Sequence, residues 1–201
     1  MTGFFKHLSD ITKIHQRAAF VDVERRITPK ESAFLKLAGE RYSCRSFAST
    51  EVTDDEIDKI VEAARLAPSA QNRQPFHIWA VRDHDALDKI KEATRYTYDA
   101  PLIFIVAYRE KDAWVRKYDG HNAAATDAAI VTTHLMLQAA DLGLGTTWVA
   151  SFDPARLKEL FPELSGYEPF ALLPTGHPSD TSSPSPSHTE RRPLSSLLTK
   201  I

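Results

Sequence analysis

Two short stretches, FHIWAVR (76–82) and LIFIVAY (102–108), decide the fold class of this chain. Both are rich in β-branched and aromatic residues and are bounded by turn or helix signals, a pattern typical of strands. Asp83, which directly follows the first stretch, is placed to cap a helix between them. A glycine turn and a strand are expected in GLGTTWVASF (143–152), and a last strand in YEPFALLPTG (167–176).

Helix signals surround these strands. Thr53 and Glu56 have the spacing of a capping box, and the apolar residues after them follow one helix face until Pro68. Residues 121–142 are apolar nearly all round, which predicts a helix buried in a core or between subunits. The Asp-Pro pair at 153–154 opens another short helix.

Helices and strands alternate too irregularly for a doubly wound sheet. We therefore expect an α+β domain over residues 39–176, with a mixed β-sheet sandwiched by helices. Ahead of it, apolar residues recur at helical spacing over 4–20, and TPKE (28–31) starts a second helix that ends at Gly39. These signals predict an N-terminal helical extension over residues 1–38.

The C-terminal residues 177–201 are expected to form an extended arm. Residues 177–188 are rich in proline and serine and almost devoid of large apolar side chains, whereas ERRPLSSLL (190–198) offers leucines again. An arm that leaves its domain and then offers apolar residues usually packs on a second subunit. The sequence thus favours an arm that packs on a second subunit.

Composition excludes several classes of protein. The chain has 201 residues, 42% of them hydrophobic, and a net charge of −2, so it lacks the basic field expected of a nucleic-acid-binding protein. The longest apolar runs are far shorter than the ~20 residues that cross a membrane. There is no signal-peptide core, and Cys44 is the only cysteine, which favours a cytoplasmic location. The scattered histidines give no zinc pattern.

The stretch RYSCRSF (41–47) is the first candidate site. In an extended segment Arg41, Ser43 and Arg45 point to one side, and two guanidinium groups beside a hydroxyl suit a phosphate monoester. The alternative is that both arginines are surface charges paired with Glu40 or Glu51.

The loop APSAQNRQP (67–75) is the second candidate. Its hydroxyl and amide side chains can bind a flat heterocycle or a sugar chain, and its small alanine allows close approach to the backbone. The alternative is a plain turn between helix and strand.

Other motifs are weaker. The single G-x-G at 143–145 does not support a dinucleotide-binding Rossmann site, and a tryptophan such as Trp148 is more often a core residue than the wall of a cofactor site. Arg191 and Arg192 act wherever the arm docks, or are simply solvated. No hydrolytic triad is recognisable, and Asp127 and His134 are interpreted as satisfied buried polar residues.

Taken in order, RYSCRSF, EAARLAPSAQNRQP, DAPLIFIVA, LMLQAADLGLGTTWVASFD and HTERRPL resemble the FMN-dependent nitroreductase family. Each motif alone is weak, but the five in this order are specific, and together they extend from Arg41 to Leu198. The resemblance implies an intertwined homodimer with two FMN sites at its interface. The first 38 residues have no counterpart in the shortest members.

The resemblance also assigns roles to residues. It implies that the flavin phosphate and ribityl end are held by Arg41, Tyr42, Ser43 and Arg45, with Arg191 or Arg192 adding to them. It implies that Pro68, Ser69, Ala70, Asn72 and Gln74 reach the isoalloxazine and ribityl chain from the other subunit. Trp148, Val149 and Ala150 match the strand beside the flavin's reactive edge, where a backbone amide faces N5. Where some members have a polar or basic residue that reaches the pyrimidine, this chain offers Arg95 or Tyr96.

The implied activity is that of a ping-pong oxidoreductase. NADH or NADPH would reduce FMN, and the reduced flavin would pass electrons to a nitroaromatic, a quinone or a similar small acceptor, so no catalytic side chain is expected. The alternatives are a specialised acceptor, as in reductive dehalogenases or flavin-consuming enzymes, a non-catalytic flavin-binding protein, or a plain structural protein.

Overall fold

The computed structural model describes residues 32–201. The helix expected over 4–20 and the helix start at 28–31 lie outside the described residues. The chain divides after Glu40 into two units, which are described separately. In the first, α2 spans Ala33–Glu40 and includes Gly39, so the prediction that Gly39 follows the helix was wrong. A glycine costs a helix only about 1 kcal/mol relative to alanine, and the cost is smallest near an end that frays.

The second unit, Arg41–Ile201, is built on a four-stranded sheet in the order β1-β2-β4-β3. The four strands pair antiparallel throughout. The parallel component expected of a mixed sheet is an isolated bridge between Ser43 and Thr146. The strand expected over 143–152 is shorter than predicted, because after Thr146 only a hydrogen bond from the Thr147 amide to Pro174 and an isolated bridge from Val149 to Leu172 continue the pairing. The strands are β1 (Phe76–Val81), β2 (Leu102–Tyr108), β3 (Gly145–Thr146) and β4 (Glu168–Gly176).

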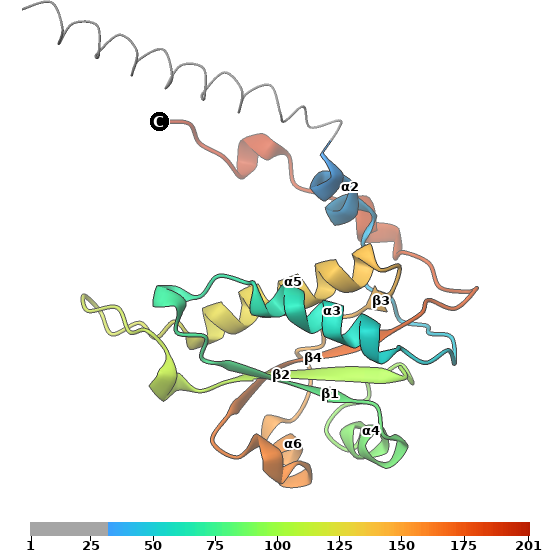
Figure 1. Cartoon of the computed structure of the whole chain (residues 1–201). Helices are drawn as coiled ribbons and strands as arrows, with labels where there is room; N and C mark the ends of the chain where they lie inside the picture. The colour runs from blue at the N-terminus through green and yellow to red at the C-terminus, as the bar shows by residue number, and fades with distance from the viewer. Residues whose placement is uncertain (1–31) are drawn as a thin grey trace, which may run out of the picture. The chain divides into compact units, whose positions relative to one another are not determined.

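Helices cover both faces of this sheet (Figure 1). On one face lie α3 (Asp54–Arg65) and α5 (Ala124–Asp141), and on the other α4 (His84–Lys91) and α6 (Pro154–Leu160). The central strand β2 serves both layers: Phe104 packs in the core on the α3 and α5 side, and Ile105 in the core on the α4 and α6 side. Successive side chains of a strand point to opposite faces, which explains why LIFIVAY is apolar without alternation. The predicted α+β class with a sandwiched sheet is confirmed.

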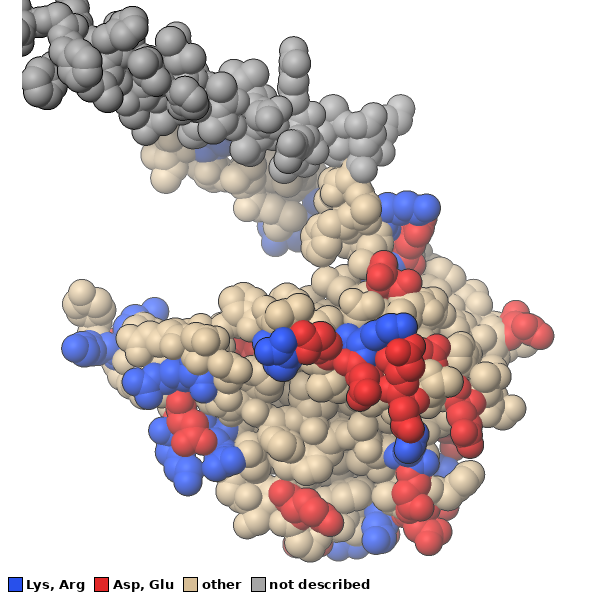
Figure 2. Space-filling model, in the orientation of Figure 1, with Lys and Arg blue, Asp and Glu red and all other residues tan. Residues whose placement is uncertain are grey.

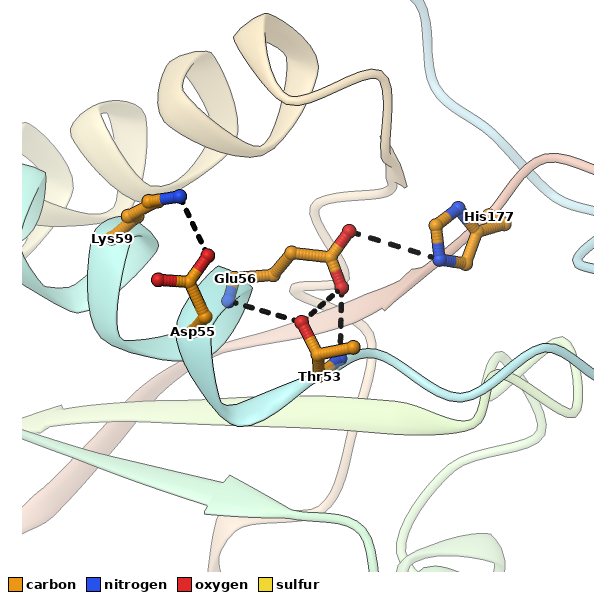
Figure 3. A network of polar contacts seen from close by, with 5 residues as sticks. All are labelled: Thr53, Asp55, Glu56, Lys59 and His177. Carbon is orange, nitrogen blue, oxygen red and sulfur yellow. Dashed lines mark hydrogen bonds and ion pairs between the residues drawn. The ribbon is translucent and has the colours of Figure 1, made fainter.

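The start of α3 is held by the predicted capping box (Figure 3). The amide of Glu56 donates to the Thr53 hydroxyl at 3.3 Å, and the amide of Thr53 donates to the Glu56 carboxylate at 2.8 Å. The second oxygen of that carboxylate lies 3.8 Å from the ring of His177, the residue that follows β4. One glutamate thereby joins the start of α3 to the beginning of the C-terminal arm.

The other predicted caps are also present. The Asp83 carboxylate accepts from the amide of Ala86 at 3.0 Å, and the Asp153 carboxylate accepts from the first amides of α6 at 3.0 Å. Short 3-10 turns complete the unit, at Ala70–Asn72, Glu110–Asp112, Pro162–Leu164, Pro186–Thr189 and Leu194–Ser196. Across residues 32–201, no helix has the length and apolar character needed to traverse a lipid bilayer.

Candidate functional site

The segment 41–47 is an extended edge fixed by its neighbours. The amide of Cys44 donates to the carbonyl of Thr146 at 3.0 Å, next to the bridge between Ser43 and Thr146. The Cys44 side chain is fully buried, and on the opposite side of the extended segment Arg41 and Ser43 are half-buried while Arg45 is exposed. A Cβ on Gly145 would lie 2.5 Å from that of Cys44, so this approach requires a glycine.

The beginning of the C-terminal arm returns to this edge within the same chain. The amide of Ser179 donates to the carbonyl of Ser46 at 3.1 Å, and the hydroxyls of the two serines lie 2.7 Å apart. Further along, the Ser182 hydroxyl lies 2.9 Å from that of Tyr42 and 3.2 Å from the Cys44 sulfur. These contacts lead the arm past the segment, and Arg191 of the arm comes close enough to Arg41 for their charges to interact.

Arg41 and Arg191 lie close enough for their positive charges to interact. Burial, and next the nearby charge of Arg191, lower the pKa of Arg41. The Nη1 atom of Arg41 is buried and has no hydrogen-bond partner among the described residues. No carboxylate forms an ion pair with either arginine in this part of the chain. A buried guanidinium nitrogen without an acceptor is costly, and an anion with several oxygens would satisfy it.

The other two arginines predicted to bind the phosphate, Arg45 and Arg192, donate to backbone carbonyls. Arg45 is exposed and donates to the carbonyl of Ser43 at 3.3 Å. Arg192 donates to the carbonyl of Ser196 at 3.2 Å. Of the two arm arginines, Arg191 is therefore the one whose charge reaches Arg41.

Left-handed residues and hydrogen bonds define the shape of the loop 67–75, which joins α3 to β1. Its backbone is left-handed at Gln71, Asn72 and Gln74, with φ of 53°, 54° and 49°. Such a conformation costs a residue with a side chain about 1–2 kcal/mol, so it persists only where other contacts hold it. The Ser69 hydroxyl accepts from the amide of Gln74 at 3.0 Å, and the Asp127 carboxylate accepts from the amide of Ala70 at 3.0 Å.

The two candidate segments lie at opposite ends of α5 (Figure 1). The loop is bound to Asp127, in the first turn of that helix, while the segment 41–47 pairs with Thr146, which follows its end. The helix has 18 residues, a length of about 27 Å at 1.5 Å per residue. A single chain therefore does not bring the segment 41–47 and the loop together.

The stretch 148–150 lies against β4. The amide and the carbonyl of Val149 are both hydrogen-bonded to Leu172, at 2.9 and 3.0 Å. The Trp148 ring packs edge-on against Phe170, with centroids 5.6 Å apart, and Ala150 is exposed. Adjacent amides of an extended strand point in opposite directions. The amides that remain to face a ligand are thus those of Trp148 and Ala150, and not that of Val149.

The pair expected near the pyrimidine, Arg95 and Tyr96, lies beside the end of this stretch. The Arg95 guanidinium sits over the Tyr96 ring, 5.0 Å from its centroid, and donates to its hydroxyl at 2.9 Å. Both line a hollow of about 350 Å³ with Ser151, Phe152 and Asp153.

Sequence reasoning missed two polar residues here. Asp127 was expected to be buried with its hydrogen bonds satisfied. It is buried, but only one carboxylate oxygen has a partner, the amide of Ala70; the other has none among the described residues. Its signal was an acidic residue in the first turn of an apolar helix. The Thr146 hydroxyl, beside Ser43, is likewise buried without a partner in residues 32–201, and nothing in the sequence distinguished it. His134 is satisfied by the carbonyl of Ile130 at 2.9 Å.

Comparison with known proteins places the chain in a family. The family model described as "Nitroreductase family" matches residues 38–97 and 94–177. A protein of Archaeoglobus fulgidus, provisionally named NADH dehydrogenase/NAD(P)H nitroreductase, is 31% identical over 150 residues, which cover 73% of this chain and 86% of that one.

Solved structures agree. A nitroreductase family protein from Clostridium difficile 630 is 35% identical with a TM-score of 0.77, covering 84% of this chain and 98% of that one. A provisionally named nitroreductase from Desulfovibrio desulfuricans, solved in complex with FMN, is 26% identical with a TM-score of 0.70, covering 85% and 98%. The order of motifs, the fold and these matches agree, and the chain belongs to the nitroreductase family.

Proposed function

We propose that this protein is an FMN-dependent oxidoreductase that uses NADH or NADPH. The observation that carries the proposal is the buried Nη1 of Arg41, which lacks a hydrogen-bond partner among the described residues and lies close to the charge of Arg191. Two positive charges close together, one with an unpartnered buried nitrogen, are unfavourable without a bound anion. They suit a phosphate monoester such as that of FMN. The FMN complex of the Desulfovibrio desulfuricans structure and the name of the Archaeoglobus fulgidus relative support it.

The residues divide into a phosphate end and a ring end. Arg41, Tyr42, Ser43 and Arg45 bind the phosphate and ribityl end, and Arg191 adds a second positive charge. Pro68, Ser69, Ala70, Asn72 and Gln74 contact the ring and the ribityl chain. The stretch Trp148–Val149–Ala150 lies beside the ring and offers it the amides of Trp148 and Ala150.

The site is completed by two copies of the chain. The edge and the loop are held at opposite ends of α5, so the edge of one subunit meets the loop of its partner. The exposed leucines of the arm support this arrangement: Leu194 is 71%, Leu197 62% and Leu198 51% exposed. Apolar side chains in such a group favour burial against a second subunit.

When bound, FMN would supply electron transfer from NADH or NADPH to a second substrate, for which we propose a nitroaromatic, a quinone or a similar small acceptor. The chain's own residues bind and orient the flavin. Arg41, Arg191 and the amides of Trp148 and Ala150 also place positive charge and hydrogen-bond donors around it, an arrangement that stabilises negative charge.

An absorbance spectrum of the purified protein tests the proposal, followed by NADH and NADPH oxidation with menadione or a nitrofuran. A flavin band together with acceptor-dependent oxidation is expected. No flavin after incubation with FMN would overturn the proposal. A flavin band without oxidation by either acceptor would move the assignment to a specialised acceptor or a flavin carrier.

A further inference from the structure

A group of cations lies beside the ring-binding loop and takes no part in the proposed flavin site. Arg73 belongs to the loop itself, and Lys111 and Lys117 lie in the connection between β2 and α5. We call these three residues the basic strip. All three are exposed, and none has a carboxylate at ion-pair distance within residues 32–201.

Hydrogen bonds hold the segments of the basic strip together. The amide of Arg109 donates to the carbonyl of Pro75 at 2.8 Å. Arg73 lies two positions before Pro75 and Lys111 two positions after Arg109, so this hydrogen bond links the segments that carry them. Lys117 belongs to a hairpin whose base is closed by a bridge between Val115 and Asn122. The Asn122 side chain donates to the carbonyl of Glu110 at 2.9 Å, which fixes the hairpin to the turn that carries Lys111.

The neighbouring charges are already neutralised. Arg116 forms a bidentate salt bridge with the Asp119 carboxylate, at 2.8 and 2.6 Å. The Arg109 guanidinium lies 3.4 Å from the Asp112 carboxylate. Glu110 is the remaining carboxylate of this connection, so the positive charge is in excess. Figure 2 shows Lys and Arg side chains gathered at this end of the molecule, at the left of the view. The whole chain, by contrast, carries a net charge of −2.

From this placement we infer that the basic strip binds the phosphate groups of the nicotinamide co-substrate and makes the enzyme prefer NADPH to NADH. The inference rests on the proposed function, because it places the flavin ring at the neighbouring loop. A dinucleotide whose nicotinamide reaches the ring must lay its phosphates on the surface around it. NADPH differs from NADH by a phosphate monoester, which carries about −1.5 to −2 charges at pH 7, and uncompensated cations favour the more highly charged nucleotide.

The test compares the two nucleotides on the flavin-loaded protein. In the double variant Lys111→Gln/Lys117→Gln we expect kcat/KM to fall about five- to tenfold for NADPH and about twofold for NADH, the range of two exposed ionic contacts. We expect kcat at saturating nucleotide to be unchanged. The matched control is Lys89→Gln, an exposed lysine of α4 on the other side of the sheet, which should change neither value.

A second readout does not depend on turnover. By calorimetry, adenosine 2′,5′-bisphosphate should bind the wild-type holoprotein more tightly than AMP, and the double variant should lose most of that difference. Equal effects on both nucleotides, or no preference for the bisphosphate, would overturn the inference. The inference would also be overturned if the wild-type protein oxidised NADH and NADPH equally well and the double variant showed no change. That result would leave the proposed function intact.

Discussion

The amide of Ala70 donates a hydrogen bond of 3.0 Å to the carboxylate of Asp127, a residue that is only 2% exposed. This bond ties the loop between α3 and β1 to the first turn of α5. The loop contains left-handed backbone at Gln71, Asn72 and Gln74, so it needs an external anchor to keep its shape. Asp127 is thus a positioning residue for the ring end of the proposed flavin site.

Replacing Asp127 should release the loop. For Asp127→Ala we expect a loss of about 1–3 kcal/mol in the free energy of unfolding, because a buried amide loses its acceptor. We expect the affinity for FMN to fall as well. Asp127→Asn keeps an oxygen that can accept the bond and should cost less in both. Thermal unfolding and fluorescence titration with FMN measure the two effects, and equal losses in the two variants would show that the negative charge matters more than the bond.

Arg191 and Arg192 form a matched pair for the phosphate end. Arg191→Ala should weaken FMN binding about ten- to a hundredfold, since hydrogen bonds to charged groups are worth about 1.5–3 kcal/mol. Arg192→Ala should have a small effect, because the charge that acts on Arg41 is that of Arg191. Riboflavin, which lacks the phosphate, should bind both variants as it binds the wild type. A larger effect of Arg192→Ala would contradict the assignment.

Local signals were enough to predict most of the elements. The caps at Thr53, Asp83 and Asp153 are set by residues within three positions of them, so they can be recognised in the sequence alone. The strands β1, β2 and β4 were predicted because side-chain type over six to nine residues decides them. The end of α2 was wrong, because a single glycine near a fraying end is a weak stop.

The site depends on contacts that no local pattern encodes. Ala70 and Asp127 are separated by 57 positions, and Tyr42 and Ser182 by 140. The left-handed backbone at Gln71 and Gln74 is not favoured by glutamine and results from the anchors of the loop. The family resemblance predicted that these segments form a site, whereas their placement at opposite ends of α5 required the structure.

Gly145 permits the close pairing between β3 and the segment 41–47. In Gly145→Ala the new Cβ would lie 2.5 Å from Cβ and 2.6 Å from Sγ of Cys44, and the Cβ of Cys44 cannot move away unless the paired backbone shifts. We expect a loss of about 1–3 kcal/mol in the free energy of unfolding, the usual cost of overpacking. Gly39→Ala is the control: nothing lies within 4 Å of its added Cβ, and alanine favours helix. Urea unfolding compares the two, and equal stabilities would contradict the predicted clash.

The charge of Glu56 should stabilise the fold in a pH-dependent way. Hydrogen bonds from the amide and then the hydroxyl of Thr53 lower the pKa of Glu56, with a smaller contribution from His177 opposed by Asp55. A carboxyl whose pKa is lower in the folded state adds stability above its unfolded pKa, about 4.3, and loses it as the pH falls through the folded value.

We therefore expect Glu56→Gln to cost about 0.5–1 kcal/mol at pH 7, within the range of a helix cap, and less at pH 3. Glutamine can still close a capping box, so this variant isolates the charge. Thr53→Ala removes the cap itself and should remain destabilising at both values. A Glu56→Gln penalty that does not change between pH 7 and pH 3, measured by urea unfolding, would refute the role of the charge.

A heterodimer of two variants tests whether each site is shared between subunits, which neither variant can test alone. If the edge of one subunit meets the loop of the other, Arg41→Ala damages one half of both sites in its homodimer, and Asn72→Ala damages the other half. In a heterodimer of the two variants, one site then carries both defects, while the other combines the intact edge of one chain with the intact loop of its partner. Differently tagged chains, co-expressed and purified through both tags, should bind FMN at about half the stoichiometry of the wild type with wild-type affinity. If each chain instead built its site alone, every site of the heterodimer would carry a defect, and no wild-type site would be recovered.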